Sequence, residues 1–229
     1  MTDEVAEAFA EIALRLHDEP DVEQTVESVL DYALVATGAG NAGVMFVHGG
    51  GRVESVAITD PVVEKADRMQ MELGEGPCLS AIREHGTFRI ADTLDEPRWP
   101  EWSSRIAQLG LRCVLGIQLH TVDTMVGALN LYAAEPGWFA DPDDLAIAEI
   151  FARHASIALA TARREAHLEA AMDARHRVGL AQGILMERHS LTDEQAFELL
   201  RRFSQEHHIK LNEVARQIIE DRNGSRHAD

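Results

Sequence analysis

The chain of 229 residues carries 39 Asp and Glu against 21 Lys and Arg, a formal net charge of -18. This balance argues against loose electrostatic attraction to a polyanion, because phosphate backbones are held chiefly by clustered Lys and Arg. The charge is uneven, since residues 1–169 hold 12 basic and 29 acidic side chains and residues 170–229 hold 9 and 10. Only the C-terminal segment is therefore expected to present a basic face.

Two amphipathic helices are predicted before residue 40. The second begins after Pro20 and ends at the glycine-containing run 37–40. The first has apolar residues at helical spacing, which are Val5, Phe9, Ile12 and Leu16.

An antiparallel sheet is predicted between residues 42 and 132. Runs with a period of two or an apolar composition form two hairpins and a short separate strand, the first hairpin turning at a triple glycine. The expected strands are residues 42–47, 52–58, 87–90, 112–120 and 125–132. Helices are expected near residues 61–72 and from Cys78, so the domain should be α+β, with helices packed on the sheet.

A long helix is predicted from Asp141. Residues 141–144 supply a capping Asp, a Pro at the first helical position and carboxylates in the first turn. An unbroken helix to residue 188 would be about 70 Å long at about 1.5 Å per residue; the alternative is a break within residues 165–172. The stripe expected to lie on the sheet domain is Leu145, Ala148, Ala152, Ala155, Leu159 and Ala162.

A second face of this helix predicts a homodimer. It repeats every seven residues, as in a coiled coil, and such a rod cannot bury both faces within one small domain. The expected interface residues are Ile150, Ile157, Arg164, Ala171 and Val178.

Two short helices are predicted at the C-terminus. Thr192 and Gln195 supply a capping box for the first, and the second begins near Leu211. Neither is stable alone at this length, so both should pack with the end of the long helix as a three-helix bundle. Its expected core is Ala181, Leu185, Ala196, Phe197, Leu200, Val214 and Ala215.

This module resembles the ANTAR family of output domains. The resemblance covers about residues 172–222 and is carried by RVGLAQGILMER at 177–188, AFELLR at 196–201 and LNEVA at 211–215. It implies binding to RNA stem-loops and regulation of transcription by antitermination. Many members of the family have Lys where this chain has Gln182. A dimer that offers two modules to paired hairpins would recover affinity through effective concentration.

The RNA contacts are expected among polar residues around the bundle core, because Arg makes planar contacts to phosphates and stacks on unpaired bases. Gly183 is included since glycine inside a helix costs about 1 kcal/mol relative to alanine, which a close approach of RNA or of another backbone would offset. Tight helix packing is the alternative explanation. The candidates are Gln182, Gly183, Arg188, Arg201, Arg202, Ser204, Lys210 and Arg216.

Residues 21–162 resemble a GAF domain, most clearly in GEGPC at 74–78 and GALNLY at 127–132. This resemblance implies a small-molecule site between the sheet and its covering helices and loops, although core packing is the alternative for each candidate. The candidates are Met45, Gly76, Cys78, Trp99, Trp102 and Ile106. Trp99 and Trp102 lie in a Pro-rich stretch that is expected to be a loop and a lid.

The two resemblances together match one-component GAF-ANTAR regulators. The expected protein is a signal-responsive antitermination regulator whose GAF domain senses a small molecule or a partner and controls RNA binding through a dimeric helix. The expected parts are an N-terminal helix at 1–20, the GAF-like domain at 21–162, a helical linker at 163–171, the ANTAR domain at 172–222 and a disordered tail at 223–229.

Other functions and locations are weighed on the same residues. No P-loop, dinucleotide fingerprint or HExxH motif occurs, so no enzyme, cofactor or metal is expected. The acidic residues 1–7 and the absence of an 18-residue apolar run predict a cytoplasmic protein. Three alternatives stay open: a DNA-binding helix-turn-helix with its turn near His208, a sulfoxide reductase using Cys78 and Cys113, and a signalling module that binds only proteins.

Overall fold

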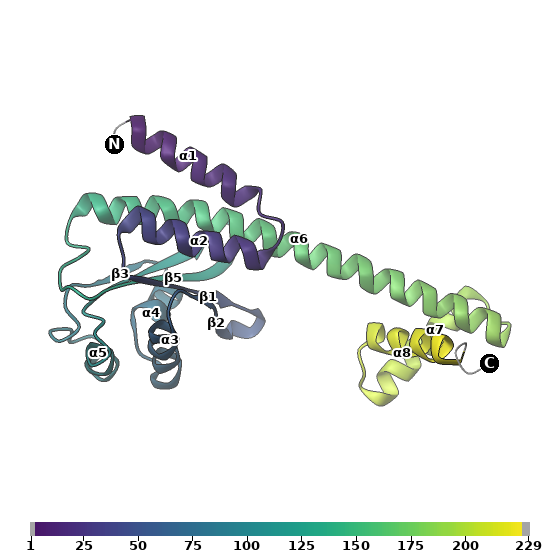
Figure 1. Cartoon of the computed structure of the whole chain (residues 1–229). Coiled ribbons are helices and arrows are strands. Elements are labelled where there is room, and N and C mark those ends of the chain that lie inside the picture. The colour runs from purple at the N-terminus through teal and green to yellow at the C-terminus, as the bar shows by residue number, and fades with distance from the viewer. Residues whose placement is uncertain (1–2, 226–229) are drawn as a thin grey trace. The chain divides into compact units, whose positions relative to one another are not determined.

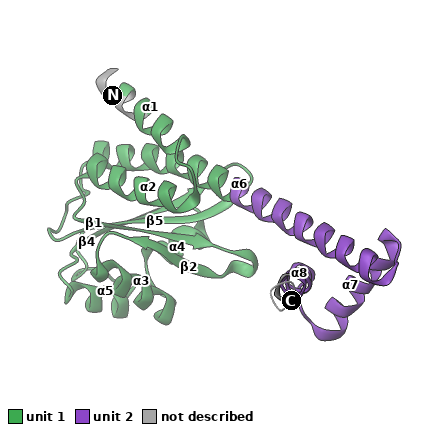
Figure 2. Cartoon of the chain, turned by 45° about the vertical axis from the view of Figure 1, so that its right-hand side comes forward, with its two compact units in different colours: residues 1–163 green, residues 164–229 purple. Residues whose placement is uncertain are grey.

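The computed structural model describes residues 3–225, which fall into two compact units that meet between Arg163 and Arg164 in the sequence (Figure 2). The helices are α1 (Asp3–His17), α2 (Val22–Thr37), α3 (Pro61–Leu73), α4 (Pro77–Glu84), α5 (Pro100–Ala107), α6 (Pro142–His189), α7 (Asp193–His207) and α8 (Leu211–Ser225). The strands are β1 (Asn41–Val47), β2 (Val53–Ile58), β3 (Thr87–Ile90), β4 (Cys113–His120) and β5 (Met125–Ala133).

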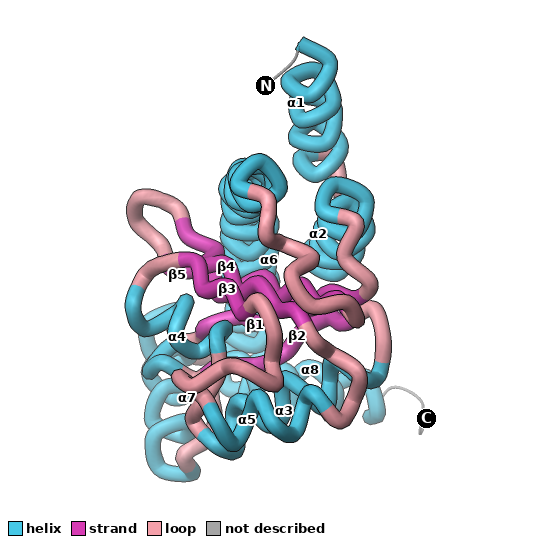
Figure 3. Tube along the Cα trace, turned by 90° about the vertical axis from the view of Figure 1, so that its left-hand side faces the viewer, coloured by secondary structure: helices cyan, strands magenta, loops and turns pink. Residues whose placement is uncertain are grey.

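The sheet of the first unit has the strand order β2-β1-β5-β4-β3, and every neighbouring pair is antiparallel. The α2 helix and the first half of α6 cover one face, whereas α3, α4 and α5 cover the other (Figures 1 and 3). Strands covered on both faces are apolar along their length, and β4 and β5 are buried almost throughout. The α+β fold class is therefore confirmed, and each expected strand is present with ends that differ by at most one residue.

The α6 helix runs from Pro142 to His189 without the break that was the alternative. The expected stripe packs on the sheet, with Ala148, Ala152, Ala155 and Leu159 buried in the core that α6 shares with α2 and the strands. An 18-residue window of α6, with a mean hydropathy of 1.3, is long and apolar enough to cross a membrane, although the sequence, which has no uninterrupted apolar run of that length, was expected to contain no membrane span. This is weak evidence, because a partly buried core helix passes the same test.

The second unit contains a three-helix core. The buried residues are Ala181, Leu185, Ala196, Leu200, Val214 and Ala215. Thr192 and Gln195 form the expected capping box. Phe197 is an error of the sequence prediction, because its side chain is 39% exposed. The α8 helix continues to Ser225, so it includes the first residues of the expected disordered tail; residues 226–229, like the side chains of Val5 and Phe9, lie outside the described part.

Candidate functional site

A buried polar cluster lies between α3 and the sheet of the first unit. Asp67 of α3 accepts hydrogen bonds from Ser55 Oγ at 2.7 Å, Asn130 Nδ2 at 2.9 Å and Tyr132 Oη at 3.1 Å. Asp67, Asn130 and Tyr132 are completely buried. One carboxylate therefore joins α3 to both β2 and β5.

The cluster contains a carboxylate that hydrogen-bonds only to neutral groups. Burial raises the pKa of Asp67 from its ordinary 3.8 to about 6, although the three hydrogen bonds act in the opposite direction. Asn130 Oδ1 is also buried and has no hydrogen-bond partner among the described residues. The Asp67 carboxylate would therefore be stabilised by a proton, and Asn130 Oδ1 by a hydrogen-bond donor.

The contacts of Gln70 explain why the GEGPC segment at residues 74–78 has a glycine at position 76 and how its Cys78 is held. Gln70 Nε2 donates to Cys78 Sγ at 3.0 Å, and Gln70 Oε1 accepts from the Cys78 backbone N–H at 3.0 Å. Gly76 has a φ of 133°, and a Cβ at this position would overlap Oε1 of Gln70. Burial raises the pKa of the Cys78 thiol well above its ordinary range, which keeps the thiol protonated.

The structure places the candidate ligand residues beneath α3, α4 and α5, in two apolar clusters. Met45 and Cys78 pack with Ala128. Trp99, Trp102 and Ile106 pack with residues of α3, β3 and β4. All five are buried, and Gly76 lies beside them at the start of α4.

The expected loop with a tryptophan lid is not present. Trp102 lies in α5, is completely buried and donates from Nε1 to the carbonyl of Ala66 at 3.1 Å. Trp99 precedes α5, is 8% exposed and lies under the guanidinium of Arg98. Both tryptophans are therefore part of the packed core.

Sequence reasoning missed Asp67, Gln70, Asn130 and Tyr132. A signal existed, since Val63, Ala66, Asp67 and Gln70 follow the helical spacing of one buried face. An Asp and a Gln on an apolar helix face, like the Asn within GALNLY, mark polar groups that must find partners inside.

In the second unit, the adjacent RNA-binding candidates Gln182 and Gly183 lie in the part of α6 that contacts the start of α7. Gln182 Nε2 donates to Asp193 Oδ1 at 2.9 Å, which ties α6 to the first turn of α7. Gly183 is exposed, and a Cβ added there would meet nothing within 4 Å. Tight helix packing therefore does not explain this glycine, and its open surface leaves room for a partner.

Three candidate arginines form ion pairs within their own helices. Arg201 pairs with Glu198 at 2.7 Å, and Arg202 lies 3.7 Å from Glu206. Arg216 pairs with Glu213 and Glu220, which raises the pKa of Arg216, and its hydrogen bond lowers the pKa of Glu213. These pairs are exposed, so an incoming phosphate can compete for the guanidinium groups.

The remaining candidates differ in their surroundings. Ser204 Oγ donates to the carbonyl of Ile209 at 2.6 Å and so holds the turn between α7 and α8. Arg188 and Lys210 are exposed near the end of α6 and the start of α8. We therefore assign Ser204 a structural contact and leave Arg188 and Lys210 as exposed cations.

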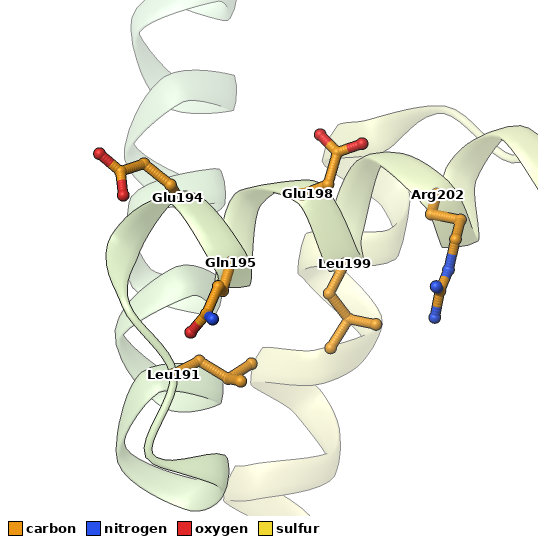
Figure 4. A pocket seen from close by; sticks show the side chains of 6 residues that line it. All are labelled: Leu191, Glu194, Gln195, Glu198, Leu199 and Arg202. Atoms are coloured by element: carbon orange, nitrogen blue, oxygen red, sulfur yellow. The ribbon is translucent and has the colours of Figure 1, made fainter.

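One side of α7 has the wrong charge for RNA. A groove of about 520 Å³ has Leu191 and Leu199 in its lining, and Figure 4 shows Glu194 and Glu198 at its edge, with their carboxylates directed away from the two leucines. Arg202 is the cation that lines the groove. Because the carboxylates would repel phosphates, this side of α7 is unsuited to a nucleic-acid backbone.

The five residues of the expected dimer face, which repeat every seven positions along α6, have different surroundings in the structure. Ile150 is partly buried against the core of the first unit, and Val178 is partly buried against the core of the second. Ile157, Arg164 and Ala171 are exposed. The five residues therefore do not form one open face.

The fold is an α+β domain, with a buried polar cluster beneath α3, followed by a module of three helices. Residues 19–160 match the GAF domain family, and residues 166–219 match the ANTAR domain family. The chain belongs to the GAF domain family and, with its ANTAR domain, is a GAF-ANTAR protein. No curated protein matches the chain.

Solved structures support the fold alone. The GAF domain of a phosphoenolpyruvate-protein phosphotransferase from Acinetobacter has a TM-score of 0.56 at 11% identity, over 73% of this chain and 99% of that one. The corresponding GAF domain from Coxiella burnetii has a TM-score of 0.53 at 16% identity, over 71% and 96%. The bacteriophytochrome RpBphP3 from R. palustris has a TM-score of 0.58 at 12% identity, over 81% of this chain and 42% of that one.

Proposed function

We propose that the protein is a cytoplasmic, signal-responsive regulator that binds paired RNA hairpins and acts by transcription antitermination. The observation that carries this proposal is the match of residues 166–219 to the ANTAR domain, with the core of the three helices completely assembled. The GAF and ANTAR content is regulatory, and we propose that the chain acts without catalysis. Within it, residues 21–162 serve as the sensor, 163–171 as a helical linker and 172–222 as the RNA-binding module.

The proposed RNA surface centres on the exposed end of α6. Gly183 gives RNA access to the helix backbone, and Arg188 supplies an exposed cation five residues further along α6. Lys210 adds an exposed cation at the start of α8, whereas the acidic groove on α7 stays outside the surface. Arg201 and Arg216 join when phosphate replaces their carboxylate partners, whereas Arg202 lines the acidic groove and is not included in the surface.

The proposed signal acts on the layer between the sheet and α3, α4 and α5. The six candidate ligand residues lie there, as does the Asp67 cluster. Because the candidate side chains are buried, a small ligand has to displace part of this core in order to bind. A partner protein that shifts the covering helices is the alternative signal.

Binding of the full-length protein to a two-hairpin RNA, compared with duplex DNA at one fixed salt concentration, tests the proposal. We expect retention of the RNA and not of the DNA, and selection from a random RNA pool should enrich hairpin loops. Stronger binding to the duplex would favour the helix-turn-helix alternative, and failure to retain any RNA would favour a module that binds only proteins. Arg188→Ala should weaken RNA binding, whereas Arg68→Ala, which removes an exposed arginine from the first unit, should not.

A further inference from the structure

Two lone pairs meet one amide group at the end of the β4–β5 hairpin. Gln118 Nε2 lies 2.8 Å from His85 Nδ1 and 3.3 Å from Met125 Sδ. A thioether sulphur can only accept a hydrogen bond, so the part of the amide that faces it is the NH₂ group, and His85 Nδ1 must accept from the same group. The imidazole therefore carries its proton on Nε2, and the nitrogen and sulphur acceptors are no farther apart than the sum of these two distances.

The backbone holds His85 against β4. His85 ends α4 in the left-handed conformation, with a φ of 59°, at a position where Gly or Asn is usual. The backbone N–H of Gln118 donates to the carbonyl of Gly86 at 3.3 Å, which ties the residue after His85 to the strand. The Gln118 side chain is only 7% exposed. The fold therefore fixes where this imidazole lies.

A second imidazole lies across the hairpin from Met125. His120 and Met125 are opposite one another in the β4–β5 pair, and side chains in this relation share a face of the sheet, with Cβ atoms about 5 Å apart. His120 is exposed and Met125 is partly buried. Both line a cleft of about 370 Å³, together with His85, Gln118 and the hairpin turn at residues 121–124. Solvent therefore reaches a place where two imidazoles and a thioether lie close together.

The donor atoms decide which ligand fits this cleft. Thioether sulphur selects soft ions such as Cu(I), and imidazole nitrogen also suits copper, whereas Mg²⁺ and Ca²⁺ need oxygen ligands. Zn²⁺ is bound by thiolate, imidazole and carboxylate groups, and no three His, Cys, Asp or Glu side chains among the described residues could hold a metal ion. A soft ion that uses the sulphur is therefore the ligand that this set of donors favours.

We propose that His85, His120 and Met125 form a binding site for a single Cu(I) ion. The ion takes the point at which Gln118 Nε2 meets the two lone pairs, and the amide turns aside into the cleft. His85 binds through Nδ1 and keeps its proton on Nε2, free to donate a hydrogen bond as metal-bound imidazoles do. No metal was expected from the sequence, because the three residues form no ligand-spacing motif. The proposal goes beyond the proposed function and does not depend on RNA binding.

Competition for Cu(I) between the full-length protein and the chelator bicinchoninate, without oxygen, tests the site. Wild type should bind one equivalent, and His85→Asn, His120→Asn and Met125→Leu should each raise the dissociation constant about tenfold or more. Asn tolerates the left-handed conformation at position 85, and Leu has nearly the volume of Met. The matched controls are His208→Asn, since His208 ends α7 with a φ of 55°, and Met71→Leu, since Met71 is 40% exposed on α3. Both controls should bind like wild type; unaltered binding in any of the three site variants, or equal weakening in a control, would overturn the proposal.

Methyl NMR of the methionines gives a second readout on the folded wild-type chain. Ag(I) serves as a soft probe ion, and the buried thiols of Cys78 and Cys113 do not compete for it while the chain is folded. Of the seven methionine ε-methyl signals, that of Met125, assigned with Met125→Leu, should shift first and should be complete at one equivalent. Zn²⁺ should leave this signal unaltered, because it does not use thioether sulphur. An unmoved Met125 signal, or simultaneous shifts of several methionine signals, would show adventitious binding only and overturn the proposal.

Discussion

Asp67 of α3 accepts a hydrogen bond from Asn130 Nδ2 of β5 at 2.9 Å, at a point where neither side chain reaches solvent. The other end of the same amide, Oδ1, has no hydrogen-bond partner among the described residues. A buried acceptor without a donor costs about 1–3 kcal/mol, and a buried carboxylate without a cation adds to that cost. The stability of the core of the first unit should therefore depend on whether Asp67 is protonated.

The first prediction is that Asp67 makes the protein less stable as the pH rises. Its pKa in the folded chain is about 6, above the ordinary 3.8, so folding retains a proton that the unfolded chain has released between these values. The stabilisation is complete below pH 3.8 and is lost as the pH rises through about 6, in total about 3 kcal/mol at 1.36 kcal/mol per pKa unit. Urea unfolding between about pH 5.5 and 8 should record roughly 1 kcal/mol of this loss.

Asp67→Asn provides the comparison for this prediction. An amide has nearly the same shape and does not titrate, so the variant should lose the Asp67 share of the pH dependence. Asp92→Asn is the control, because that carboxyl pairs with Arg112 at 2.6 Å and its pKa is lowered. Parallel curves of unfolding free energy against pH for wild type and Asp67→Asn would contradict the assignment.

The second prediction concerns the backbone before Cys78. Gly76→Ala should destabilise the protein by about 2–4 kcal/mol, because a Cβ overlaps Gln70 Oε1 and the φ of 133° is strained for alanine. Gln70 cannot move aside without losing its two hydrogen bonds to Cys78. Gly74→Ala is the matched control: its φ of 68° is also positive, but its Cβ meets nothing within 4 Å, so it should cost only about 1–2 kcal/mol. Equal losses in chemical denaturation would show that the overlap is relieved.

Much of the fold follows from local patterns in the sequence. Alternating and apolar runs predicted the five strands, and Asp141 with Pro142 predicted the start of α6. The stretch around Pro97 and Pro100 was wrongly expected to be a loop, because Pro at the first position begins α5 and the burial of Trp102 stabilises it. Local composition around Pro97 and Pro100 was compatible with a loop or a helix, and the tertiary packing of Trp102 selects the helix.

The candidate sites were harder to predict, because they depend on pairings between distant residues. Asp67 and Asn130 are 63 positions apart, and no spacing rule joins them. Ile150 and Val178 fit a seven-residue repeat, but each packs into its own core, and a repeat alone does not say which face is free. Gly183 was identified correctly as unusual, and only the structure shows that its surroundings are open.

The third prediction separates stability from RNA binding at Gly183. Gly183→Ala should stabilise the second unit by up to about 1 kcal/mol, since alanine is the better helix former and its Cβ meets nothing within 4 Å. Hairpin affinity should nevertheless fall, because the methyl group would occupy the space into which RNA is proposed to enter. Gly179→Ala is the control; it has the same open surroundings and should stabilise the helix without weakening the binding of a single hairpin. Unchanged affinity for Gly183→Ala, measured by fluorescence anisotropy, would remove this glycine from the RNA surface.

The fourth prediction is that the ion pair with Glu213 makes Arg216 less available to bind an RNA phosphate. The two side chains are hydrogen-bonded on α8, and Glu213 keeps a negative charge because this contact lowers its pKa. Glu213→Gln should therefore raise RNA affinity, since it removes a charge that repels phosphate and makes Arg216 more available. Its salt dependence should steepen by about one unit of log K per log salt if Arg216 then neutralises a phosphate. Glu64→Gln, which breaks the exposed pair with Arg68 in the first unit, changes the net charge equally and should leave RNA binding unaltered. An equal gain from both variants would mean that net charge alone, and not the pairing of Arg216, sets the affinity.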